Sequence, residues 1–218
     1  MAGATKKLTP QELAAWFEEA FGDTVRRLNW STALKAVAGV MEYWTKENFD
    51  KSHSPEGLPW KPLSMERPRN VGKGASLPLR DKGILMASLT SSAHGNAIRK
   101  ITGTLLEFGT NVEYSALHQY GGTIRPKNAK ALTIPLTTEA VTAGRAPNFP
   151  RDLFVVWPKG KPHGWLAESK GKKGNLIFHY LLVSKSTVPA RPFLGFNAAM
   201  LEDIKETLRD SVIEQIDP

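Results

Sequence analysis

Five histidines, two pairs of neighbouring carboxylates and a few short glycine-containing strings are the parts of this 218-residue chain that could do chemistry. No histidine has the short spacing to another histidine or to a carboxylate that is typical of a zinc site. The sequence contains no GxSxG, no P-loop and no GxGxxG string. Cysteine is absent, which excludes disulfides, thiolate metal ligands and cysteine nucleophiles. We therefore expect a protein that is not an enzyme and that needs no cofactor or metal.

The carboxylates and His118 are better explained by structure than by catalysis. The pairs Glu18-Glu19 and Glu202-Asp203 fall in stretches with helical periodicity, where solvated side chains are the simplest interpretation. His118 opens the string His118-Gln119-Tyr120-Gly121-Gly122. We expect it to fix the turn into the two glycines by a hydrogen bond, with general-base catalysis as the alternative.

Arg191 lies in a second string, Val188-Pro189-Ala190-Arg191-Pro192-Phe193-Leu194-Gly195. The prolines at 189 and 192 restrict the backbone on both sides of Arg191 and hold the segment extended. Arg191 would then point in a fixed direction, either into an intramolecular ion pair on an edge strand or into a contact with another subunit. In such a contact the planar guanidinium can grip a carboxylate. We expect Phe193 to be a core residue.

The net charge of +8 is concentrated in one segment. Residues 122–191 hold 12 Lys and Arg against 3 Asp and Glu, a balance of +9, whereas the remainder holds 17 against 18. One interpretation of this segment is a positively charged surface that binds DNA or an acidic partner. The other is a set of loops whose lysines are simply solvated. The candidate interaction residues are Lys159, Lys161, Lys170, Lys172, Lys173 and Arg191.

Two stretches near the N-terminus predict helices, grouped here as residues 9–49. The first begins with Thr9-Pro10-Gln11-Glu12, where Thr9 can cap, proline suits the first helical position and Glu12 completes a capping box. It ends near Phe21-Gly22, and its apolar face is formed by Leu13, Trp16, Phe17 and Ala20. The second spans residues 31–49, with an apolar stripe of Leu34, Val37, Met41 and Trp44.

Residues 50–80 are rich in proline and glycine and predict a long loop, anchored by Trp60. Residues 81–88 and 113–120 predict short helices, and glycine at 121–122 can end the second of these in a left-handed conformation. Residues 197–215 predict a final helix whose buried stripe is Leu201, Ile204, Leu208 and Val212.

Strands are predicted between these helices. A meander is expected over residues 89–110, with a tight turn at 92–97, and shorter strands are expected within the basic segment at 131–134, 153–157 and 175–183. The fold class is therefore α+β, with an antiparallel sheet of about four to five strands and two long helices packed on one face. We expect a single domain, residues 1–218, in which 81–122 and 188–216 form the core and 123–187 form a basic β and loop insertion.

Four pieces of the sequence, in this order, resemble the tail-completion and virion-morphogenesis proteins of tailed bacteriophages. They are "SPEGLPWKPLS" at 54–64, "LRDKGILMASL" at 79–89, the string from Leu106 to Gly122 and the string at 188–195. The family-motif residues are His118, Gln119, Tyr120, Gly121, Gly122, Pro189, Arg191, Pro192 and Phe193. None of them forms a catalytic constellation, so the resemblance implies a structural role.

The resemblance implies a bacteriophage structural or assembly protein of the tail-completion or neck type, acting at the head–tail junction. It implies a homo-oligomeric ring, most commonly a hexamer, that contacts neighbouring tail and head-connector proteins and is located in the virion after assembly in the host cytoplasm. The alternative is a DNA-binding protein that uses residues 122–191. No run of apolar residues is long enough for a membrane span, and no secretory signal is evident, so no membrane partner is expected.

Overall fold

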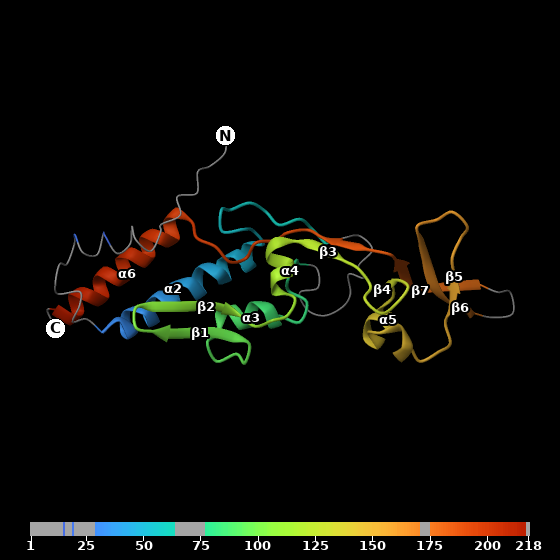
Figure 1. The fold of residues 1–218 in the computed structure, drawn as a ribbon, viewed down its shortest axis with the longest axis horizontal. Coiled ribbons are helices and arrows are strands. Elements are labelled where there is room, and N and C mark those ends of the chain that lie inside the picture. The colour runs from blue at the N-terminus through green and yellow to red at the C-terminus, as the bar shows by residue number, and fades with distance from the viewer. Residues whose placement is uncertain (1–14, 16–18, 20–28, 64–76, 171–174, 217–218) are drawn as a thin grey trace, which may run out of the picture. The chain divides into compact units, whose positions relative to one another are not determined.

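The computed structural model describes residues 15, 19, 29–63, 77–170 and 175–216 (Figure 1). The described chain divides into two compact units. The first unit takes its described residues from the chain up to Pro59, from Ile84–Ser115 and from Pro192 onward; the second takes them from Trp60–Gly83 and Ala116–Arg191. The predicted helix at 9–22 lies outside the described residues apart from residues 15 and 19.

The first unit is built on two helices, α2 (Trp30–Lys51) and α6 (Ala198–Ile216) (Figure 1). The Asn29 side chain caps α2 by accepting a hydrogen bond from the Ser31 amide at 3.1 Å. In the same way, the Asn197 side chain caps α6 by accepting from the Met200 amide at 2.8 Å. The shared core consists of Ala33, Val37, Met200, Ile204, Leu208 and Val212.

The interface between these helices differs slightly from the sequence prediction. Ile204, Leu208 and Val212 are buried as expected, but Met200 is buried where Leu201 was expected, and Leu201 is half-buried. Trp44 Nε1 donates to the Asp203 carboxylate at 2.8 Å, so one member of the Glu202-Asp203 pair holds the two helices together.

A hairpin of β1 (Ala97–Thr102) and β2 (Leu105–Thr110) packs with α2 and with the short helix α3 (Ile84–Thr90). The hairpin and its preceding turn confirm the predicted meander. Arg99 fixes it in place: its guanidinium lies 3.6 Å from the centre of the Phe108 ring, donates to Glu42 at 2.9 Å and donates to the Leu89 carbonyl at 2.6 Å.

The second unit contains two antiparallel sheets. Strand β3 (Gly122–Ile124), which follows the short helix α4 (Ser115–Tyr120), pairs with β8 (Ser186–Val188). A four-stranded sheet has the order β4-β7-β6-β5, and its strands span Leu132–Pro135, Asn175–Val183, His163–Lys170 and Phe154–Val156 respectively.

One face of the four-stranded sheet is covered by α5 (Thr138–Ala143) and a 3₁₀ turn, η2 (Ala146–Asn148). The buried centre of this face is Ala140, Phe149 and Tyr180, and the Tyr180 hydroxyl donates to the Ala140 carbonyl at 3.2 Å. A bulge in the pairing of β6 with β7 lies between Leu166 and Ala167. It places His179 and Tyr180 on the same side of β7, facing α5.

The mixed helix and antiparallel-sheet class is confirmed, but the sheet arrangement differs from the expectation. Instead of one sheet of four to five strands, the described residues form sheets of two, two and four strands. The four-stranded sheet lies inside the basic segment that was expected to elaborate the fold. The single-domain assignment stays a prediction. Within the described parts of the chain, no helix is both long and apolar enough to cross a membrane.

Candidate functional site

The two family-like strings meet in the second unit, where the chain leaves α4 and enters β3. The Arg191 amide donates to the His118 carbonyl at 2.7 Å, and Gly122 pairs with Val188 in the β3–β8 ladder. The strings at 118–122 and 188–195 are therefore held together by backbone hydrogen bonds. A hydrogen bond that fixes this turn was expected at His118, and the bond from the Arg191 amide is accepted by the His118 backbone oxygen.

Gly121 is the residue that requires glycine at this junction. Its φ is +72°, and a Cβ built on it would lie 2.7 Å from the Ala190 backbone nitrogen, so both conformation and space exclude a side chain. Gly122 was expected to act in the same way, but it is the first residue of β3 and has no positive φ. Its restriction is spatial, since a Cβ there would lie 2.9 Å from Leu117 Cδ1.

Arg191 is only 6% exposed, and its guanidinium donates to two backbone carbonyls. Nε donates to the Lys61 oxygen at 2.8 Å and Nη2 to the Pro62 oxygen at 3.0 Å. Arg191 therefore ties the string at 188–195 to the piece at 54–64. A role for it in a subunit contact stays a prediction.

The other sequence-predicted residues separate between the units. Phe193 is buried in the first unit, where its ring lies 5.7 Å from Phe49. Tyr120 is exposed. Among the candidate lysines, Lys159, Lys161 and Lys170 are exposed at the ends of β5 and β6. Lys172 and Lys173 lie outside the described residues. Gln119, Pro189 and Pro192 are half-buried.

A polar cluster on the α5 side of the sheet was not predicted. Arg151 binds Glu139 through both oxygens at 2.7 and 2.6 Å, and its Nε contacts Glu168 at 2.8 Å. The same Glu168 oxygen lies 3.1 Å from His179 Nε2, and His179 Nδ1 lies 3.0 Å from the Thr137 hydroxyl. The residues are up to 42 positions apart in the sequence, so no local spacing could have revealed the cluster.

Electrostatics in this cluster favour the ionised carboxylates. Hydrogen bonding to the Arg151 guanidinium holds the pKa of Glu139 and that of Glu168 below the ordinary value for glutamate. The same two carboxylates raise the pKa of Arg151, Glu139 first. Glu139, Glu168 and Arg151 therefore stay charged and paired at neutral pH.

The hydroxyl–imidazole–carboxylate order of Thr137, His179 and Glu168 superficially matches a nucleophile, a base and an orienting acid. However, the Thr137 hydroxyl also accepts the Ala140 amide at 3.2 Å and caps α5. His179 is only 2% exposed and stacks on Phe149, with ring centres 4.4 Å apart. This arrangement fits a clamp that fastens α5 to β6 and β7 better than it fits a catalytic site.

The opposite face of the four-stranded sheet is almost entirely apolar. Cross-strand partners point to the same side of a sheet, so the pairing register assigns the residues of this face. We call it the apolar sheet face; it consists of Leu132, Ile134, Phe154, Val156, His163, Trp165, Leu176, Phe178, Leu181 and Val183, with the small Ala167 and Ser169 between them.

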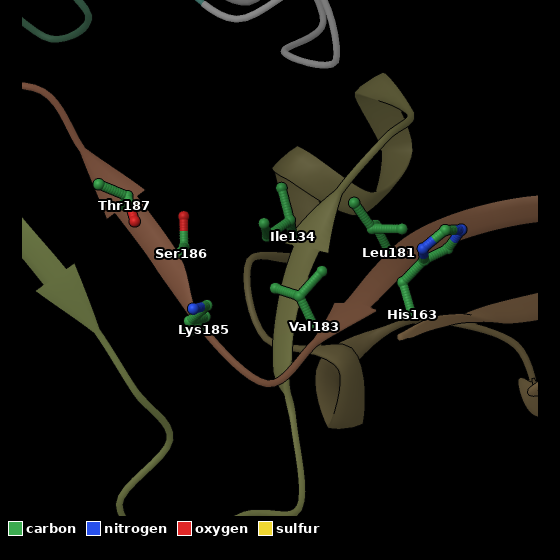
Figure 2. Close-up of a pocket in the computed structure, with 7 residues that line it drawn as sticks. All are labelled: Ile134, His163, Leu181, Val183, Lys185, Ser186 and Thr187. Atoms are coloured by element: carbon green, nitrogen blue, oxygen red, sulfur yellow. The ribbon is translucent and has the colours of Figure 1, made fainter. Parts of the chain in front are cut away.

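Large side chains of the apolar sheet face remain in contact with solvent. Phe154 is 44% exposed, Leu176 43% and Phe178 38%. A pocket with a volume of about 340 Å³ lies at one end of this face. Figure 2 shows residues that line it: Ile134, Leu181 and Val183 from β4 and β7, and Lys185 beyond β7. Contiguous exposed apolar side chains with polar residues around them mark protein interaction sites.

Comparison with known proteins gives the family. Residues 10–145 match the model of the phage virion morphogenesis family, which is more than half of the chain. The chain belongs to this family. Three of the four sequence pieces noted above lie within the match, whereas the string at 188–195 and the strands β5 to β7 lie beyond it.

The family assignment is supported by a relative, the Mu-like prophage FluMu G protein 2 of Haemophilus influenzae. The two chains are 30% identical over 112 residues, which is 51% of this chain and 65% of the relative. The chain thus aligns with just under two thirds of that protein. No solved structure matches the chain. As a member of a virion morphogenesis family, the protein has a structural or assembly role in a bacteriophage.

Proposed function

We propose that this member of the family completes the tail or neck, so that tail and filled head can join. The apolar sheet face is the observation that carries the proposal. It holds three large apolar side chains exposed by more than a third of their surface, on a regular sheet that nothing in the described part of the second unit fully covers. Assembly proteins act through surfaces of this kind.

The charges around the apolar sheet face fit a protein partner with acidic groups. Lys159 and Lys161 lie between β5 and β6 and Lys185 follows β7, and all three are exposed. Charge at the rim of an interface steers association and selects the partner, while the apolar centre supplies most of the affinity. We further propose that the protein works as a ring, with six copies as the expected number, in contact with tail and head-connector proteins.

The test compares two aspartate substitutions on opposite faces of the sheet. Phe178→Asp places a charge in the apolar sheet face, whereas Val155→Asp places one at an exposed position of β5 that points to the other side. In a phage that lacks its own copy of the gene, Phe178→Asp should leave filled heads and tails unjoined, or tails of faulty length. Val155→Asp should restore infectious particles. Normal particles from Phe178→Asp would refute the proposed role of this face.

DNA binding by residues 122–191 remains a second candidate, favoured by the exposed lysines. It predicts that binding to duplex DNA weakens by orders of magnitude between about 50 and 200 mM salt if six or more phosphates are contacted. Binding that is absent at 50 mM salt would exclude it.

A further inference from the structure

The apolar sheet face needs an occupant, and the sequence of this chain contains a segment that matches it. We propose that residues 9–22 of a neighbouring copy dock on the apolar sheet face. This inference rests on the proposed function, because it names the partner of the surface through which the protein would assemble. Residues 9–22, apart from residues 15 and 19, lie outside the described chain, so the case is made from their sequence and from the structure of the face.

The apolar content of the two surfaces is complementary. The predicted helix of residues 9–22 has a stripe of Leu13, Trp16, Phe17 and Ala20. A stripe of this kind must be buried against another element, and the apolar side of a sheet is one of the few surfaces that can bury it. On the apolar sheet face, Phe154, Leu176 and Phe178 are the large side chains left exposed for such a contact.

The charges are complementary as well. Residues 9–22 contain three acidic residues, Glu12, Glu18 and Glu19, and no Lys or Arg. The apolar sheet face contains no carboxylate, and exposed lysines lie at its strand ends. Two such faces brought together would place like charges opposite each other, which disfavours face-to-face pairing of the same surface. An acidic amphipathic segment avoids this repulsion.

A neighbouring copy is taken as the source of the segment because the proposed function is an assembly of several copies. In such an assembly the apolar sheet face of one copy meets segments of the next copy, and one contact repeated around a ring satisfies every face.

The test uses the absence of cysteine from the chain. Two full-length chains with tags of different size each receive one cysteine: Ala20→Cys in the segment, and Leu176→Cys on the apolar sheet face. When they are mixed and mildly oxidised, docking should give a mixed disulfide dimer. The matched control replaces Leu176→Cys with Val155→Cys, which is 62% exposed on the other side of the sheet. We expect at least about tenfold less mixed product with this control, because docking raises the effective concentration of one thiol near the other.

Two further variants should lower the yield of the Ala20→Cys/Leu176→Cys product towards the level of the control. Trp16→Asp in the first chain places a charge in the apolar stripe, and Lys185→Glu in the second removes a rim cation. The inference would be overturned if the mixed disulfide formed in equal yield with Leu176→Cys and with Val155→Cys. It would also be overturned if neither Trp16→Asp nor Lys185→Glu changed the yield of the Leu176→Cys product. If Phe178→Asp blocked particle assembly while the crosslink failed, only the identity of the occupant would be wrong and the proposed function would stand.

Discussion

At the scale of single residues, Gly121 and Arg191 explain why the two family-like strings occur together. Because Gly121 has no side chain, its backbone can lie close to Ala190; a Cβ at Gly121 would be only 2.7 Å from the Ala190 nitrogen. Next to Ala190, Arg191 donates hydrogen bonds to the carbonyls of Lys61 and Pro62. The family-like strings thus build a junction of the second unit, and the exposed surface that we propose as the interface lies elsewhere in that unit.

Gly121→Ala should destabilise the protein more than Gly160→Ala. Both glycines have a φ above +70°, so alanine costs about 1 kcal/mol of strain at each position. At Gly160 nothing lies within 4 Å of the added Cβ, whereas at Gly121 the clash is with backbone and should add about 1–3 kcal/mol. Denaturant unfolding of both variants measures the difference; equal losses would show that the close approach to Ala190 is absent.

The polar cluster predicts a dependence on pH. The pKa of Glu139 and that of Glu168 are lowered in the folded state by Arg151, so their contribution to stability is present above the ordinary glutamate pKa of about 4.5. This stabilising contribution is lost as the pH falls through the lowered pKa values that the two glutamates have in the folded state. Thermal unfolding between pH 7 and pH 3 should therefore show a fall in Tm below about pH 4.5. Arg151→Gln should make that fall smaller, and an unchanged fall would show that these pairs do not contribute.

At the scale of elements, the long helices α2 and α6 and the β1–β2 hairpin could be predicted from the sequence, whereas the short helix α5 was not predicted. Residues 30–51 and 198–216 carry clear helical periodicity, and the turn before Ala97 has local signals. The division into three sheets could not be predicted, because it depends on which distant strands pair, as β4 does with β7. The apolar sheet face was missed for the same reason. Its residues become one surface only through the register of four strands.

The pairing of α2 with α6 is tested by substitution on two sides of α6. Leu208 is buried in the shared core, and Leu208→Ala should cost about 2–5 kcal/mol. Ile213 is exposed on the same helix, and Ile213→Ala should change the free energy of unfolding by less than about 0.5 kcal/mol. Similar effects for both variants would mean that α6 does not use the face seen here.

At the scale of the whole molecule, we expect the excess positive charge to affect association with partners and to have little effect on the stability of the fold. Lys159, Lys161 and Lys185 are exposed and lie in the loops that follow β5 and β7. Replacing all three with glutamate should leave Tm nearly unchanged, because exposed charges contribute little to stability. The same variant should reduce the yield of joined particles, since summed charge acts on association. A variant that folds and assembles like the wild type would reduce these lysines to a solubility feature.

The family membership gives the protein an assembly role, and we propose the apolar sheet face as the surface that serves this role. The most direct test of the central claim is the copy number and position of the chain in purified phage particles, measured by quantitative mass spectrometry and by electron microscopy of labelled particles. We predict a fixed number of copies, with six expected, located where the tail meets the head. A chain that is absent from finished particles, or distributed along the packaged DNA, would contradict the account.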